Sequence, residues 1–158
     1  MKSIVITADG ELTHINGRLD WDETIGPEGR DRVRLHPSVA VSGWVNDVGL
    51  LYPERFPRNV VGSLLLVNLG ASVMPYAGPV VFTGWNAGNT ALGLTEIEPL
   101  FPARADAIDN IHAEVRRALA GDPPREMSPS WAEQMREVAD HVRTAPTPGL
   151  TVIRGERP

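Results

Sequence analysis

The loop at residues 83–93, which reads TGWNAGNTALG, gathers the side chains of this chain that are best suited to molecular recognition. It follows a strand-like run and presents Trp85, Asn86, Asn89 and Thr90 among glycines. A large aromatic ring beside two amides and a hydroxyl can hold a protein surface or a planar ligand. We therefore predict that these four residues form a binding site. The alternative is a β-turn whose Trp85 packs back onto the core.

Two further residues are candidates for the same binding surface. His36 precedes Pro37 in an expected loop, and it is the one histidine that we expect to be available for function. Residues 52–58, YPERFPR, combine aromatic, proline and arginine side chains, as recognition loops do. An exposed Phe56 would place this segment in the binding surface, so we include His36 and Phe56 among the predicted binding residues.

Catalytic and metal-binding patterns are scarce in this sequence. There is no cysteine, and no two of the four histidines have the spacing of metal ligands on one element: His14, His36, His112 and His141. The Gly-x-Ser-x-Gly, Walker A, Gly-x-Gly-x-x-Gly and His-Glu-x-x-His patterns do not occur either. We therefore assign no catalytic residue, no metal site and no cofactor, and we expect binding rather than catalysis.

Three carboxylates flank Trp21 near the start of an expected short helix. Asp20, Asp22 and Glu23 could serve as acid and base or hold a magnesium ion. Acidic residues are also common in the first turn of a helix, where they interact favourably with the helix dipole. We favour this second, structural interpretation.

The composition indicates a single domain of moderate size. The chain has 158 residues, of which 42% are hydrophobic, and this is enough for one sizeable core. The net charge of -5 argues against nucleic-acid binding unless four arginines converge on one patch: Arg32, Arg34, Arg55 and Arg58. No segment reaches the roughly 18 apolar residues of a membrane span. The first residues resemble a strand rather than a signal peptide, so we expect a cytoplasmic protein without a membrane partner.

The apolar patterns of residues 2–97 predict a largely antiparallel sheet with one packed central helix. An Asp9-Gly10 turn should join two strands in a hairpin, and helical turns should follow within residues 18–29. The central helix at residues 58–71 should be capped by Asn59 and end at Gly70. We expect strands at residues 3–8, 11–16, 32–35, 39–45, 79–83 and 91–97, with a brief pairing at 50–52.

Residues 100–145 have the spacing of two amphipathic helices. The first, at residues 106–120, should bury Ile108, Ile111, Val115 and Leu119. The second should begin at residues 128–130, with Ser130 and Glu133 in the register of a capping box, and should bury Trp131, Met135, Val138 and Val142. We expect an antiparallel helical hairpin docked on the rest of the single α+β domain, and a tail at residues 146–158.

Three short motifs in the first part of the chain resemble a known family. VNDVGLLY, PRNVVGSLLL and YAGPVVFTG occur in the order found in the domain-of-unknown-function family DUF3846, which is common in phages, plasmids and actinobacteria. The resemblance covers roughly residues 2–97. It implies an α+β domain of mobile-element origin, and it carries no activity with it. Only Lys2 among the 15 basic residues is lysine, which fits the high-GC coding bias of such genomes.

Two kinds of function fit these observations. The first is an accessory protein of a phage or other mobile element that binds a host macromolecule, most simply a host protein, without catalysis. The alternative is a small-molecule or nucleotide-binding protein, or an enzyme, with a pocket near Trp85, Asn86, Asn89 and His36. A deep pocket lined by these residues would favour the second, and a flat apolar patch would favour the first. The sequence leaves the oligomeric state open, including a homodimer.

Overall fold

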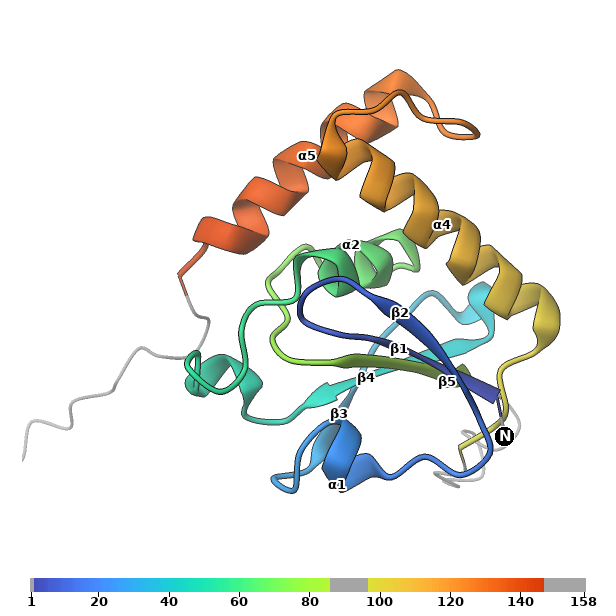
Figure 1. The fold of residues 1–158 in the computed structure, drawn as a ribbon, viewed down its shortest axis with the longest axis vertical. Helices are drawn as coiled ribbons and strands as arrows, with labels where there is room; N and C mark the ends of the chain where they lie inside the picture. Colours follow the sequence, from blue (N-terminus) through green and yellow to red (C-terminus); the bar gives the residue numbers. More distant parts are fainter. Residues whose placement is uncertain (1, 86–96, 147–158) are drawn as a thin grey trace, which may run out of the picture.

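Five antiparallel strands form one sheet in the order β2-β1-β5-β4-β3 in the computed structural model, which describes residues 2–85 and 97–146 (Figure 1). The strands are β1 (Lys2–Ile6), β2 (Leu12–Asn16), β3 (Arg30–Val33), β4 (Val41–Asn46) and β5 (Val80–Gly84). The α-helices are α1 (Trp21–Thr24), α2 (Val60–Asn68), α4 (Pro102–Ala120) and α5 (Pro129–Thr144). Two short 3-10 helices, η1 (Pro37–Val39) and η2 (Gly49–Leu51), flank β4. The predicted α+β class with an antiparallel sheet and a C-terminal pair of helices is confirmed.

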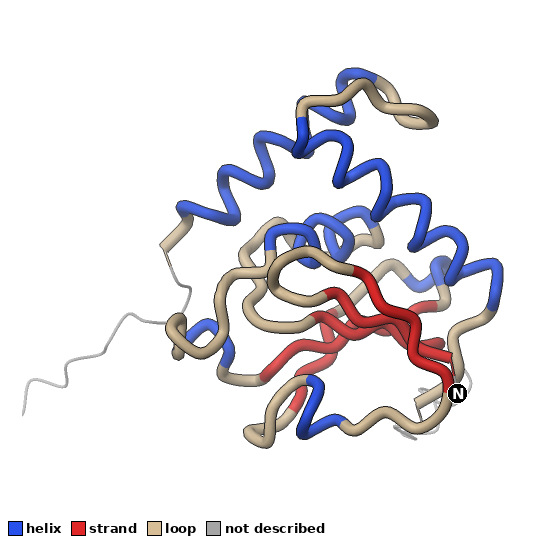
Figure 2. The backbone as a smooth tube through the Cα atoms, in the orientation of Figure 1, coloured by secondary structure: helices blue, strands red, loops and turns tan. Residues whose placement is uncertain are grey.

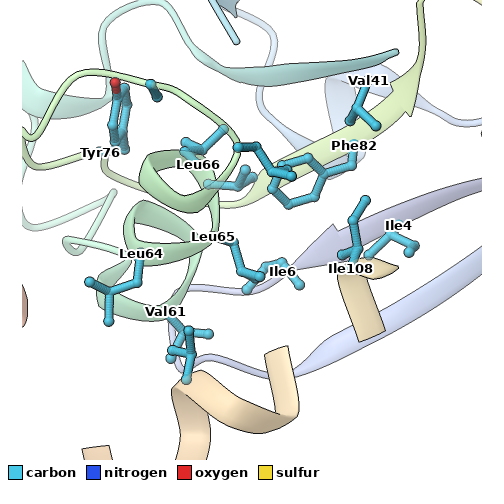
Figure 3. Close-up of a cluster of buried hydrophobic side chains, with 14 of the residues drawn as sticks. Ile4, Ile6, Val41, Val61, Leu64, Leu65, Leu66, Tyr76, Phe82 and Ile108 are labelled. Carbon is cyan, nitrogen blue, oxygen red and sulfur yellow. The ribbon is translucent and has the colours of Figure 1, made fainter. Parts of the chain in front are cut away.

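The two faces of the sheet are covered to different extents. Ile4, Ile6 and Phe82 face the main core together with leucines of α2 and Ile108 of α4 (Figure 3), and α5 contributes Met135 and Ala139 to the same core. On the other face, Val5 and Val81 belong to a smaller core that is closed by Leu19 and Ile25, from the segment around α1, and edged by Trp44. Side chains alternate between faces along a strand, so β1, β2, β4 and β5 each contribute to both cores.

The central helix α2 forms because its start is capped and most of its residues are apolar. The Asn59 side chain accepts a hydrogen bond from the main-chain N–H of Gly62, as a helix cap does. Leu64, Leu65 and Leu66 are all fully buried, so the helix is enclosed on most sides. The expectation of a helix here, capped by Asn59, is confirmed, and Gly70 follows the helix with a φ of 104°.

The two long helices meet at residues 121–128 and spread apart over α2 (Figure 2). Helix α2 contacts both of them, and one hydrogen bond of 3.0 Å joins the Trp131 indole N–H on α5 to the Asn68 side-chain oxygen on α2. Near the other end of α5, the Arg58 guanidinium donates to the Val142 carbonyl at 2.8 Å. The pair therefore encloses the main core together with the sheet.

Several local expectations need correction. The hairpin between β1 and β2 has a five-residue loop rather than a two-residue turn, because Ile6 pairs with Leu12. Residues 50–52 do not pair with a strand, since Gly49–Leu51 forms η2. The cap of α5 is Ser128, whose hydroxyl accepts from the Trp131 N–H, so the Ser130 and Glu133 capping box was wrong by two residues.

The buried stripe of α5 also differs from the prediction. Met135 and Val142 are buried as expected, but Trp131 and Val138 are only partly buried. Ala132 and Ala139 take their places, because small side chains let a helix approach its neighbours closely. On α4, Ile108 and Val115 are buried, whereas Ile111 and Leu119 lie at the margin. The expected strand at residues 91–97 falls almost entirely outside the described residues.

Candidate functional site

One end of the sheet brings together segments that are far apart in the sequence. Because neighbouring strands run antiparallel, the end of β3, the start of β4 and the end of β5 lie at the same end of the sheet. Val33 is opposite Gly43, and Val41 is opposite Gly84. The short helix η1 joins β3 to β4 at this end. Trp85 directly follows β5, and its main-chain N–H donates to the Ala40 carbonyl at 3.2 Å.

A hollow of about 470 Å³ opens at this end of the sheet, and we call it the Trp85 hollow. It brings together two of the predicted binding residues, Trp85 and His36, and adds two arginines and a serine that the prediction did not place there. Its lining consists of Arg32, Val33, Arg34, Leu35, His36, Pro37, Val41, Ser42 and Trp85. The volume lies within the range of roughly 300–1,000 Å³ that is typical of ligand pockets.

The lining of the Trp85 hollow is basic although the whole chain is acidic. Arg32 and Arg34 both border it, and neither forms an ion pair or side-chain hydrogen bond with any residue that the structure describes. None of the nine described lining residues is acidic. The Arg104 guanidinium adds a further positive charge nearby, where it donates to the Ser38 carbonyl at 3.4 Å. The hollow is therefore suited to an anionic group.

His36 shapes the rim of the hollow as well as lining it. Its Nδ1 lies 2.7 Å from the Ser38 hydroxyl and accepts from the Ser38 main-chain N–H at 3.2 Å, so the ring caps η1. Its own main-chain N–H donates to the Leu69 carbonyl. A Cβ atom at Gly70 would come within 2.7 Å of the His36 nitrogen, so only glycine permits this approach. The exposed imidazole is thus held by the end of α2.

The other predicted binding residues are not brought to this hollow by the described structure. Phe56 is buried, and the Arg55 guanidinium lies 4.8 Å from the centre of its ring. Phe56 is therefore not the exposed binding residue that the prediction required. Asn86, Asn89 and Thr90 lie outside the described residues. Among the six predicted residues, Trp85 and His36 are the two that the structure places together.

The acidic cluster near Trp21 has a structural role. Asp20 accepts a hydrogen bond of 3.0 Å from the Glu23 main-chain N–H and so caps α1. The Trp21 ring packs edge-on against Trp44, and the Arg30 guanidinium lies 4.2 Å above the Trp21 ring centre. A wide depression of about 960 Å³ borders these residues. Within residues 2–85 and 97–146, no group of three or more His, Asp or Glu side chains could share a metal ion.

The four arginines proposed as a nucleic-acid patch do not converge. Arg55 pairs with Glu28, and Arg58 reaches the Val142 carbonyl on α5. Only Arg32 and Arg34 share the Trp85 hollow. The four arginines therefore do not form the single basic patch that nucleic-acid binding would need.

A second concave surface escaped the sequence analysis, and we call it the apolar groove. It has a volume of about 390 Å³ and runs beside β3 and β4, with mainly apolar walls: Asp31, Val33, Arg34, Val45, Asn46, Asp47, Val48, Leu50, Leu51, Met74, Tyr76 and Ala77. Leu51 is 45% exposed at its rim, and the adjoining Tyr52 and Val73 are 53% and 52% exposed. The apolar run Leu50-Leu51-Tyr52 is the sequence feature that could have predicted this groove, but we interpreted it as a segment that pairs with a strand. Burial raises the pKa of the Tyr76 phenol in the wall.

Comparisons with known proteins give no independent guide to function. No protein-family model, curated protein or solved structure matches this chain. In the part of the chain that the structure describes, no helix has the length and apolar character needed to cross a membrane. The Trp85 hollow and the apolar groove are therefore the features of this chain that bear on its function.

Proposed function

We propose that this chain is an accessory protein of a mobile genetic element that binds a host protein, without catalysis, through the apolar groove. The observation that carries the proposal is the group of exposed apolar side chains at the groove: Leu51, Tyr52 and Val73 are each about half exposed. Water-exposed apolar groups of this size beside a concave apolar surface are characteristic of protein-binding sites. The mobile-element origin rests on the resemblance of residues 2–97 to DUF3846.

The chemistry of the neighbouring edge strand favours one way of docking. The strand β3 lies at the edge of the sheet, but three of its four residues are charged: Arg30, Asp31 and Arg32. Charged side chains on an edge strand oppose the addition of another strand. We therefore expect the partner to insert apolar side chains into the groove rather than to extend the sheet by main-chain pairing.

Affinity capture with matched variants tests this proposal. The tagged protein is incubated with a lysate of its bacterial host, and the retained proteins are quantified by mass spectrometry. We expect one stoichiometric partner, whose purified form loses about 30-fold in affinity when Leu51 is replaced by Asp, a loss of about 2 kcal/mol. Phe101→Ser is the control, because Phe101 is an apolar residue that is more exposed than Leu51 and does not line the groove.

Two results would reject the proposal. One is the absence of any stoichiometric protein from the captured material. The other is a partner whose affinity is the same for Leu51→Asp, Phe101→Ser and the unmodified chain, because such a partner would bind somewhere else.

A further inference from the structure

We infer that the Trp85 hollow is a second, independent binding site for a small ligand in which a planar ring carries an anionic oxygen group. Mononucleotides and aromatic carboxylates share this chemistry. The inference does not depend on the apolar groove or on a protein partner. It rests on three features of the hollow: its charge, the Ser42 hydroxyl in its lining, and its aromatic wall.

The charge comes from arginines that have no acidic partner. A guanidinium group can donate two parallel hydrogen bonds to a phosphate or carboxylate, which makes arginine the residue best suited to such groups. Arg32 and Arg34 line the hollow and form no ion pair with any described residue. By contrast, Arg55 and Arg116 pair with Glu28 and Glu11. The two arginines of the hollow are therefore available for an external anion.

The hydroxyl of Ser42 adds a polar group to the lining. Ser42 is only 5% exposed, and it borders the hollow. A hydroxyl can both donate and accept a hydrogen bond, so it can pair with an oxygen or nitrogen atom of a ligand in the hollow.

The aromatic wall accounts for the planar part of the ligand. Trp85 is partly buried and lines the hollow together with apolar side chains, including Leu35 and Val41. An indole beside aliphatic groups favours a flat, apolar ring, and stacking adds to the gain from removing apolar surface from water. A simple inorganic anion would use the arginines and leave this wall in water.

Four probes separate the parts of this recognition. Isothermal titration calorimetry is carried out with adenosine monophosphate, adenosine, inorganic phosphate and benzoate. We expect adenosine monophosphate or benzoate to bind at least about tenfold more tightly than adenosine and phosphate, because adenosine lacks the anionic group and phosphate lacks the planar ring. Tighter binding of adenosine monophosphate assigns the ligand to phosphorylated compounds, and tighter binding of benzoate assigns it to aromatic carboxylates.

Variants locate the binding in the hollow. Arg32→Gln and Trp85→Leu should each lower the affinity for the tighter-binding probe by about tenfold or more. Arg34 is left unchanged, because it also lines the apolar groove. Arg125→Gln is the control: it removes the same charge from an exposed residue in the α4–α5 connection, outside the hollow, and should bind as the unmodified chain does.

Each unfavourable outcome rejects the inference. It fails if neither adenosine monophosphate nor benzoate binds more tightly than about 1 mM, or if adenosine or phosphate alone binds as well as they do. It also fails if Arg32→Gln retains full affinity, or if Arg125→Gln loses as much as Arg32→Gln. Thermal unfolding of each variant accompanies the titrations, and Arg32→Gln decides the result if Trp85→Leu does not fold. The Leu51→Asp variant of the groove should bind these probes normally, so the two proposals can fail separately.

Discussion

Asn59 joins three parts of the fold through one fully buried side chain. Its Oδ1 accepts from the Gly62 N–H at 2.8 Å and so begins α2. Its Nδ2 donates to the Ile6 carbonyl of β1 at 2.9 Å and to the Gly78 carbonyl ahead of β5 at 3.0 Å. Each of these three polar partners would lose its hydrogen bond in the core without the amide, so Asn59 fixes the position of the helix on the sheet.

Replacing Asn59 with Ala should therefore destabilise the protein more than an ordinary helix cap would. Loss of a cap costs about 1 kcal/mol, and each buried carbonyl left without a donor costs about 1–3 kcal/mol. We expect a total loss of roughly 3 kcal/mol in the free energy of unfolding, measured by urea denaturation. Asn16→Ala, at an exposed position of β2, is the control and should change stability by less than about 0.5 kcal/mol. Equal effects of the two variants would contradict this role.

At the scale of elements, the connection between α4 and α5 is held by one carboxylate. Both oxygens of Glu114, on α4, lie 3.1 Å from the main-chain nitrogen of Arg125, and one lies 3.3 Å from that of Met127. Burial by itself raises the pKa of Glu114, but the N–H groups of Arg125, Met127 and Glu126 and the charge of Arg117 outweigh it. The pKa of Glu114 is therefore lower than its ordinary value of 4.5.

This lowered pKa predicts how stability depends on pH. The unfolded chain takes up a proton at a higher pH than the folded one, so the contribution of Glu114 is complete above about 4.5 and is lost as the pH falls through the lower folded value. Glu114→Gln should be less stable at neutral pH and should lose less stability on acidification, as measured by urea unfolding at several pH values. Glu133→Gln, on an exposed face of α5, should behave like the unmodified chain. Parallel curves for all three proteins would refute this assignment.

Helix α5 provides a second test at the scale of elements. Ala139 is fully buried, whereas its neighbour Val138 is only partly buried and lies at the edge of the core. The carboxylate of an Ala139→Asp variant would have neither water nor a partner beside it. This variant should lose about 3 kcal/mol or more in the free energy of unfolding. Val138→Asp should cost clearly less, because its carboxylate can turn towards water. Thermal unfolding of the two variants measures the difference, and a larger effect at Val138 would place the packed face where the sequence suggested it.

At the scale of the whole molecule, one main core connects the sheet to all the larger helices. Ile6 of β1 and Leu65 of α2 belong to one cluster of buried side chains (Figure 3), and Val115 of α4 and Met135 of α5 belong to the same cluster. No described layer separates the C-terminal helices from the rest of the domain. The helices therefore take part in the stability of the whole domain rather than forming an appended unit.

This continuity predicts a single cooperative unfolding transition. Amide hydrogen exchange should give similar opening free energies for the middle of α5 and for β5, because neither can open without exposing the shared core. The measurement is hydrogen exchange with mass spectrometry on peptides that cover the two elements. Exchange of α5 at a free energy several kcal/mol below that of β5 would show that the helical pair opens by itself.

The two proposed sites also meet at the scale of the whole molecule. Val33 and Arg34 line both the Trp85 hollow and the apolar groove, which lie on either side of the end of β3. A change at Arg34 should therefore affect both sites, whereas changes at Arg32 or Leu51 should affect one. The net charge of -5 hides this local arrangement, because the basic residues of the hollow are balanced by acidic residues elsewhere.

The sequence by itself determined the elements whose signals are local. Alternating apolar residues marked β1, β4 and β5, and the cap at Asn59 with a run of buried leucines marked α2. The apolar spacing predicted one amphipathic helix at residues 106–120 and a second that begins at residues 128–130, and both exist as α4 and α5, with α4 beginning four residues earlier. These features depend on neighbours within a few residues, so propensity and periodicity can specify them.

The tertiary structure alone decided where the predicted site residues lie relative to one another. Trp85 and His36 were chosen for their chemistry, but their meeting with Arg32 and Ser42 depends on the order β5-β4-β3, which no local pattern encodes. Phe56 was included as a binding residue on the condition that it is exposed, but it packs against Gly78, whose missing side chain makes room for the ring. Burial and proximity result from the packing of distant segments, because the free energy of removing apolar surface from water depends on the whole assembled core.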